Sequence, residues 1–151
     1  WVCFFCILIT WPATGQTAQM VQDAQNIQAL LDAMSKDWNA HDAKAYSRAF
    51  SEEADFTDVV GTNVFGKDSI EKLHEKSFQT VLKNSSLKIT GKKIRYITND
   101  IIAVDAWWEM MISQTDDGKN STLQKGLANL ILTRNDKSWL ILIMHNMILP
   151  G

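Results

Sequence analysis

Three segments in the first half of the chain carry the hydrophobic spacing of amphipathic helices. Residues 23–40 place apolar side chains at steps of three and four, which puts them on one helical face. Asp42 is a suitable N-cap for a second, short helix over residues 43–50, and a third helix is expected from Gly66 to about Leu82. The apolar positions are Ile27, Leu30, Leu31, Met34 and Trp38 in the first helix and Ile70, Leu73, Phe78 and Val81 in the third.

Strand patterns occupy most of the remaining positions. Residues 54–60 alternate between apolar and polar side chains and stop at Gly61. Four longer apolar segments follow, at about residues 87–96, 101–113, 123–134 and 139–149. Turn residues separate them, which predicts an antiparallel meander, and Gly91 is expected at a bulge. Helices that precede a run of strands indicate an α+β fold, with the helices on one face of a curled sheet.

The segment from Trp1 to Trp11 is apolar and uncharged. It is shorter than the roughly 20 apolar residues that span a bilayer, and it resembles the hydrophobic region of a secretory signal. We therefore expect residues 1–18 to be a truncated signal peptide, cleaved near Gly15 or Ala18. Residues 22–150 would then form the mature domain, which would be secreted or periplasmic. A buried N-terminal strand is the alternative interpretation.

The composition narrows the class of protein. The chain has 151 residues, which fits one domain of about 100–200 residues, and its net charge is -2. Nucleic-acid binding is not expected, because phosphate binding depends on clustered Lys and Arg. Cys3 and Cys6 both lie within the expected signal, so the mature domain would have no thiol chemistry. The three histidines lack a metal-binding spacing, and no metal or cofactor is expected.

A set of residues stands at spacings that resemble one superfamily. The set is the segment from Trp38 to Ala43, then Phe50, Ala54-Asp55-Phe56, Gly61, Gly66, Trp108, Trp139 and His145-Asn146. In this order it resembles the NTF2-like superfamily over about residues 24–150, and within it the SnoaL-like group and its SgcJ/EcaC-type branch. The resemblance implies a cystatin-like cone, in which three N-terminal helices pack on a curved, mostly antiparallel sheet. It also implies a pocket at the open end of the cone and a homodimer formed through the outer face of the sheet.

Asp58 is the first candidate catalytic residue. It shares a face of the expected strand with Phe56, and the segment from Glu52 to Gly61 resembles the stretch that carries the catalytic base of ketosteroid isomerases. Apolar neighbours raise the pKa of a carboxyl group, which suits proton abstraction. The alternative is structural, because an Asp shortly before a glycine often bonds the backbone of a turn.

His74 is the second candidate, since it lies on the apolar face of the third helix, one turn from Ile70 and from Phe78. Facing inward, it could serve as a second acid–base group or hold a ligand oxygen. The isomerases carry a polar pocket residue, a Tyr, at the matching position. The alternative is a core histidine that makes a single hydrogen bond.

Four residues are expected as pocket wall, with plain core packing as the alternative: Met34, Trp38, Phe56 and Trp108. Trp107 alternates to the opposite face of its strand, where it suits a dimer contact. His145 and Asn146 are both candidate ligand-binding residues near the end of the last strand. Because they are adjacent, they point to opposite faces, and the isomerase comparison puts Asn146 inward.

The residues that would complete a steroid isomerase are absent from the sequence. That chemistry needs an oxyanion hole made of a Tyr and a protonated Asp. Met34 stands at the Tyr position, and the strand from Leu123 to Arg134 contains no Asp. Such electrostatic partners usually contribute more than the base does. The sequence therefore favours binding over turnover.

Binding is thus the first functional hypothesis: an exported homodimer that holds a small, largely apolar molecule in a conical pocket, without catalysis or with weak acid–base chemistry. The alternative is an acid–base enzyme of the isomerase, dehydratase or cyclase type that uses Asp58 as its base. A further alternative is the oxidoreductase activity that the SgcJ/EcaC label suggests, although the sequence carries no flavin or nicotinamide motif. No membrane contact is expected after signal cleavage.

Overall fold

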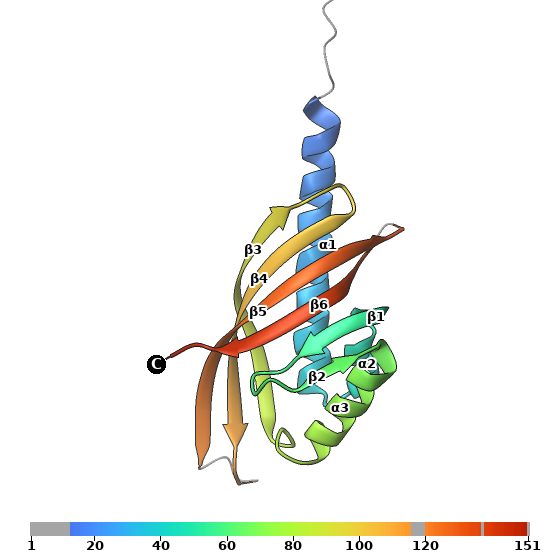
Figure 1. The fold of residues 1–151 in the computed structure, drawn as a ribbon. Coiled ribbons are helices and arrows are strands. Elements are labelled where there is room, and N and C mark those ends of the chain that lie inside the picture. The colour runs from blue at the N-terminus through green and yellow to red at the C-terminus, as the bar shows by residue number, and fades with distance from the viewer. Residues whose placement is uncertain (1–12, 116–119, 137, 151) are drawn as a thin grey trace, which may run out of the picture.

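Three helices pack along one side of a six-stranded sheet in the part of the chain that the computed structural model describes, residues 13–115, 120–136 and 138–150 (Figure 1). The helices are α1 (Ala13–Asn39), α2 (Ala43–Ser47) and α3 (Lys67–Gln79). The strands are β1 (Phe50–Thr57), β2 (Asn63–Phe65), β3 (Ser85–Tyr96), β4 (Ile101–Ser113), β5 (Ser121–Asn135) and β6 (Ser138–Ile148). The expected α+β class, with helices on a curved and mostly antiparallel sheet, is confirmed.

The sheet has the strand order β2-β1-β6-β5-β4-β3. Strands β3 to β6 form the predicted antiparallel meander. The first strand pairs in parallel with β6. It begins at Phe50 and ends at Thr57, so the predicted range of 54–60 began and ended too late in the chain. The sequence pattern missed β2, a three-residue strand that pairs with β1.

The predicted buried faces of the helices are largely confirmed. On α1, Ile27, Leu31, Met34 and Trp38 are buried, as are Ile70 and Phe78 on α3. Asp42 caps α2 as expected, because its carboxylate accepts a hydrogen bond from Ala45 N at 2.9 Å. The placement of Val81 on the buried face of α3 was wrong. That helix ends at Gln79, and Val81 in the following turn is 75% exposed.

Helix α1 is held along the edge strand β3 at both of its ends. Asn39 both donates to Leu87 O, at 3.0 Å, and accepts from Leu87 N, at 2.7 Å, so it pairs with the strand as a neighbouring backbone would. Near the other end, the Tyr96 hydroxyl donates to Met20 O at 2.8 Å. These bonds attach α1 to the edge strand at two points and fix the helix across the hollow of the sheet.

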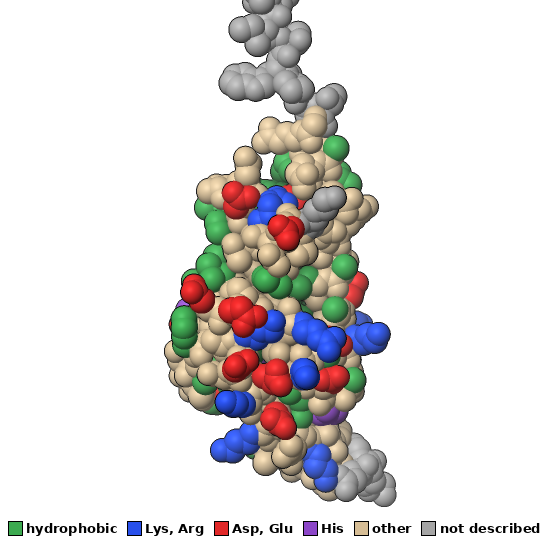
Figure 2. Space-filling view, turned by 90° about the vertical axis from the view of Figure 1, so that its right-hand side faces the viewer, with side chains coloured by type: hydrophobic (Ala, Val, Ile, Leu, Met, Phe, Trp, Pro, Cys, Tyr) green, Lys and Arg blue, Asp and Glu red, His purple; other side chains and the backbone are tan. Residues whose placement is uncertain are grey.

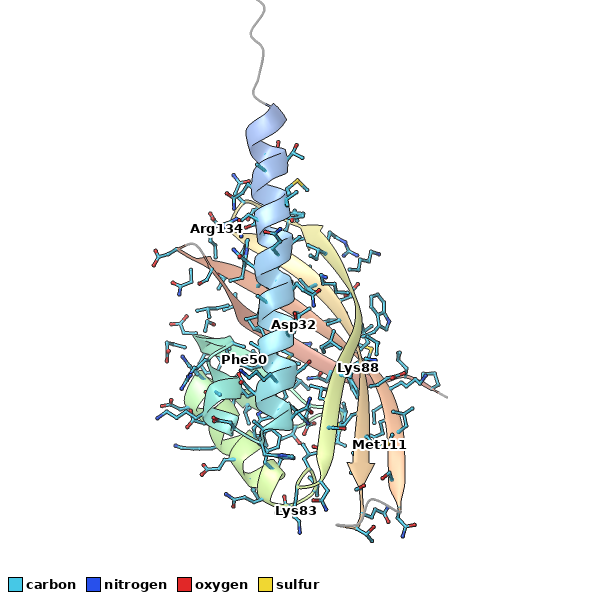
Figure 3. All side chains as sticks on the ribbon, turned by 180° about the vertical axis from the view of Figure 1, so that it is seen from behind. Asp32, Phe50, Lys83, Lys88, Met111 and Arg134 are labelled. Carbon is cyan, nitrogen blue, oxygen red and sulfur yellow. The ribbon has the colours of Figure 1, made fainter. Side chains whose placement is uncertain are left out.

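A buried ion pair connects the first half of α1 to the C-terminal end of β5, next to the start of β6. Arg134, which lies beside that part of the helix (Figure 3), donates two hydrogen bonds to the carboxylate of Asp23, at 3.1 and 3.2 Å. Trp139 Nε1 donates to the same carboxylate at 3.1 Å, and the Arg134 guanidinium lies 4.3 Å from the centre of the Trp139 ring. Burial alone would raise the pKa of Asp23, but these donors and the charge of Arg134 lower it below its ordinary value.

Besides a register shift between Phe50 and Asp55 on β1, two bulges interrupt the pairing of the sheet. One lies between Ile89 and Gly91, as expected from the glycine. The other lies in β6, where Ile141 and Ile143 pair with consecutive residues of β5 and leave Leu142 as the extra residue. Bulges increase the local twist of a strand, and both of these lie in strands that line the cavity described below.

The expected signal peptide lies mostly outside the described residues. Residues 1–12 are among those that the structure does not describe, and Ala13 to Ala18 belong to the first turns of α1. Among the described residues, no helix is both long and apolar enough to cross a membrane. Figure 2 shows acidic and basic side chains interspersed on the side of the molecule that it presents.

Candidate ligand-binding cavity

A cavity of about 470 Å³ lies between the inner face of the sheet and the helices. Each helix and every strand except β2 contributes at least one lining side chain, and most of these side chains are apolar. Val60 and Val81 line it from two turns and are 81% and 75% exposed, which places them at its rim. The cavity therefore has apolar walls and an apolar mouth.

A wider and more polar groove, of about 1300 Å³, runs beside the first turns of α1. Among the described residues that line this groove, Arg134 is the one cation. Its guanidinium already pairs with the Asp23 carboxylate. The candidate chemical groups gather in the smaller cavity, so the smaller cavity is the candidate site.

Seven of the eight residues expected at the site line this cavity: Met34, Trp38, Phe56, Asp58, His74, Trp108 and Asn146. The eighth, His145, does not. Its side chain is 56% exposed on the outer face of the sheet, where Nε2 lies 3.8 Å from Asp55 Oδ1. Strand alternation accounts for this correction, because Met144 and Asn146 occupy the inner face of this part of β6.

Four aromatic rings enclose the side chain of His74, which is only 4% exposed. Their centres lie 4.5 to 5.9 Å from the centre of the imidazole, and they belong to Tyr46, Phe56, Trp38 and Phe78. Aromatic faces and edges supply packing around the ring but no ordinary hydrogen bond to its nitrogen atoms.

The one hydrogen bond of His74 among the described residues fixes its proton. Nδ1 lies 2.8 Å from the carbonyl oxygen of Ile70, one turn earlier on α3. A carbonyl oxygen can only accept, so Nδ1 carries the hydrogen and Nε2 keeps its lone pair in the neutral ring. Burial lowers the pKa of His74 to about 4, although the bond to Ile70 and the negative charge of Asp58 oppose that shift. The imidazole is therefore neutral at pH 7.

Asp58 lies in the turn after β1, so its expected place on the strand was wrong. Its Oδ1 accepts hydrogen bonds from Val60 N at 2.9 Å and from Thr62 N at 2.8 Å, and Gly61 completes the turn with a φ of 88°. This is the structural role that the sequence left open. Asp58 also lines the cavity, half-buried, and its charge acts on His74.

Asn146 joins this polar group from β6. Its Nδ2 donates to Thr57 O at 3.1 Å, next to Asp58 in the chain, which leaves its Oδ1 as an acceptor. The ring of His74 lies 5.1 Å from that of Phe56, one residue before Thr57. The three polar side chains therefore gather around the end of β1.

The sequence reasoning missed Tyr46 and Gln124 as cavity residues. Burial raises the pKa of the Tyr46 phenol, so its hydroxyl stays protonated and can donate. A helical pattern continued across residues 43–50 would have put Tyr46 inward. Gln124 shares the alternation of Ala128 and Leu130, which was the available signal for the inner face.

The indole nitrogens of the two wall tryptophans differ in their partners. Trp38 Nε1 donates to Ser85 Oγ at 3.1 Å. Trp108 Nε1 is buried without a hydrogen-bond partner among the described residues. Both therefore present mainly apolar surface to the cavity.

Several solved structures share this fold. A protein with a cystatin-like fold from Caulobacter vibrioides is 21% identical, with a TM-score of 0.75 over 86% of this chain and 92% of that one. An NTF2-like protein from Novosphingobium aromaticivorans is 13% identical, with a TM-score of 0.80 over 95% and 93% of the two chains. A candidate scytalone dehydratase from the same species is 12% identical, with a TM-score of 0.78 over 89% of each chain. At these identities the likeness concerns the fold alone.

Comparison with curated proteins gives no match. The family model for the SnoaL-like domain, by contrast, matches residues 27–148. That range includes every candidate site residue and most of the chain. Together with the cystatin-like cone, it shows that this chain belongs to the SnoaL-like domain family of NTF2-like proteins.

Proposed function

We propose that the protein binds a small, largely apolar molecule in the cavity. The observation that carries this proposal is a volume of about 470 Å³ with apolar walls and a few polar groups at the end of β1. Cavities of about 300–1,000 Å³ with that division of polar and apolar lining are typical of small-molecule sites. At ~30 Å³ per water-sized group, the space suits a ligand of roughly fifteen non-hydrogen atoms.

A substitution that fills the cavity tests this proposal. Ala106 is buried on the inner face of β4 and lines the cavity, whereas Ala33 is exposed on α1. N-phenyl-1-naphthylamine is an uncharged dye whose emission rises in apolar surroundings. Ala106→Phe should weaken its binding by about tenfold or more, and Ala33→Phe should leave the affinity unchanged. Equal affinity of the dye for both variants would place its binding elsewhere and overturn the proposal.

Acid–base turnover is the second candidate function. The observation that favours it is the pairing of a carboxylate, Asp58, with a neutral imidazole, His74, in one cavity. The buried hydroxyl of Tyr46 supplies a donor that the sequence comparison with the isomerases lacked. One protein of similar fold is a candidate scytalone dehydratase, which makes water elimination the first reaction to test. If turnover occurs, Asp58→Asn should abolish it and leave dye binding intact.

We propose that the protein forms a homodimer through the outer face of β4, β5 and β6. Trp107, Leu127 and Met147 lie side by side across these strands. Met111 and Leu123 pair on the same face, beyond the ion pair of Glu109 and Lys125. Met111, Leu123 and Met147 are 40%, 48% and 40% exposed in the single chain. Such a cluster of exposed apolar residues indicates an interface. Sedimentation tests it, because a monomer at micromolar concentration would contradict the proposal.

Export from the cytoplasm is a further proposal, and it rests on the apolar segment from Trp1 to Trp11. If it is right, the mature protein isolated from its natural source should begin near Gly15 or Ala18. Mass spectrometry of the intact chain would show this, and a mature chain that retains residues 1–12 would contradict it.

A further inference from the structure

The hydrogen-bonding direction of His74 is set by the helix on which it stands. Ile70 O occupies Nδ1, and the aromatic neighbours make no hydrogen bond to Nε2. In the neutral ring, Nε2 is an acceptor only. A polar group of a ligand that contacts this nitrogen must therefore be a hydrogen-bond donor.

The other polar groups near the end of β1 favour the same kind of ligand. The Asp58 carboxylate can only accept, and Asn146 uses one of the two Nδ2 hydrogens on Thr57, which leaves its Oδ1 to accept and its second hydrogen to donate. Tyr46 is the neighbouring donor, and its ring centre lies 4.5 Å from that of His74. A hydroxyl group fits this arrangement, because it can donate to an imidazole nitrogen and accept from a phenol at the same time. A ketone or an ether oxygen can only accept.

The charge of the lining works against anions. Among the described residues that line the cavity, Asp58 is the one fixed charge, and none is Lys or Arg. A ligand carboxylate would lose its water there without gaining a cation, and it would lie in the same cavity as a second negative charge. The cost of that burial would exclude carboxylic acids in their ionised form.

From this geometry we propose that the ligand is an uncharged alcohol or phenol that donates its hydroxyl hydrogen to His74 Nε2. The cavity would discriminate against carboxylates and ethers of the same shape. This inference rests on the proposed binding function and names the chemical class of its ligand. His74 and Asp58 are then the residues that determine specificity.

A series of substituted naphthalenes tests the inference on the wild-type protein. Its members are 2-naphthol, 2-methoxynaphthalene, 2-methylnaphthalene and 2-naphthoate, with affinities measured by calorimetry at pH 7. The naphthol should bind about tenfold more tightly than the methoxy compound, which lacks the donated hydrogen, and the naphthoate should bind most weakly. Equal affinities for naphthol and methoxynaphthalene, or tightest binding of the naphthoate, would overturn the inference.

Two variants assign the effect to the named residues. His74→Phe keeps an aromatic ring of similar size and should remove the preference for naphthol while 2-methylnaphthalene still binds. Asp58→Asn keeps an oxygen for the turn and should raise the affinity for naphthoate. Preserved preferences in both variants would also overturn the inference. If 2-methylnaphthalene binds and naphthol binds no more tightly than it does, the inferred ligand class is wrong but the proposed binding function stands. If no member of the series binds, the proposed function fails with it.

Discussion

Gly126 lies directly opposite Trp108 on the neighbouring strand, and a Cβ at Gly126 would fall 1.9 Å from Cζ2 of the indole. The indole therefore lies flat over the glycine and forms part of the cavity wall. Only a residue without a side chain leaves space for this ring, so the pair fixes the position of the wall.

Gly126→Ala should displace Trp108 and lower the free energy of unfolding by about 1–3 kcal/mol, the usual cost of overpacking. Gly91→Ala is the control on β3, because its Cβ would meet the Trp107 ring at an ordinary 3.7 Å. Urea unfolding followed by tryptophan fluorescence measures both variants. Adding Trp108→Phe to Gly126→Ala should recover part of the loss. Without any recovery, the steric explanation would be wrong.

The low pKa of His74 makes stability depend on pH. Because burial lowers this pKa from 6.5 to about 4, the unfolded chain binds more protons than the folded one between those values. The free energy of unfolding should therefore fall as the pH falls from 6.5 to 4, by about 3 kcal/mol from this residue. Below pH 4 both states are protonated and the loss stops.

His74→Phe isolates that contribution, since the carboxylates and the other two histidines titrate in both proteins. The difference in unfolding free energy between wild type and variant should change between pH 6.5 and 4 and stay level from pH 7 to 8. A difference that is independent of pH would show that His74 titrates normally in the folded protein.

Asp58 supports both a turn and the protonation of His74. Asp58→Ala should cost about 1–2 kcal/mol of stability, because two backbone donors lose their acceptor, whereas Asp58→Asn keeps an acceptor and should cost less. Asp58→Asn also removes the nearby negative charge, so the pKa of His74 should fall below about 4. Nuclear magnetic resonance titration of the imidazole measures this shift, and a rise in the pKa would contradict the expectation.

The buried pair of Asp23 and Arg134 should matter more than the exposed pair of Glu109 and Lys125 on the outer face. Arg134→Met leaves the Asp23 carboxylate, which is 2% exposed, without its cation and should cost roughly 3 kcal/mol. Lys125→Met breaks a pair whose cation is 62% exposed and should cost less than about 1 kcal/mol. Similar losses for both would mean that Arg134 acts mainly through packing.

The sequence was informative wherever a regular repeat decides the structure. The spacing of Ile27, Leu31 and Met34 located the buried face and the end of α1, although the helix begins at Ala13, ten residues before the predicted start. Alternation located β4 at residues 101–113. The same alternation placed Trp108 inward, in the cavity wall. Periodicity predicts which face of an element is buried because burial selects residues at that period.

The predictions about β1 and β6 failed where side-chain hydrogen bonds or an extra residue interrupt the alternation of the strand. The side chain of Asp58 bonds the backbone of Val60 and Thr62 in the turn that follows β1. Leu142 is an extra residue in β6, so a count by parity puts Ile141 and Asn146 on opposite faces although both point inward. Neither event leaves a periodic signal. The chemistry of His74 needed the three-dimensional structure as well, because three of its four aromatic neighbours come from elements other than α3 and its proton position depends on Ile70 O.

The bulge at Leu142 allows the shape of the cavity to change without a change in the residues that line it. The residues on either side of it already pair with adjacent positions of β5, so removing Leu142 would leave Ile141 and Met144 facing inward. The loss would straighten the strand and change the width of the hollow, but every side chain would keep its orientation. Gain or loss of one residue at this position would therefore let proteins of this fold accept ligands of different width. The side chains that contact the polar group of the ligand would stay the same.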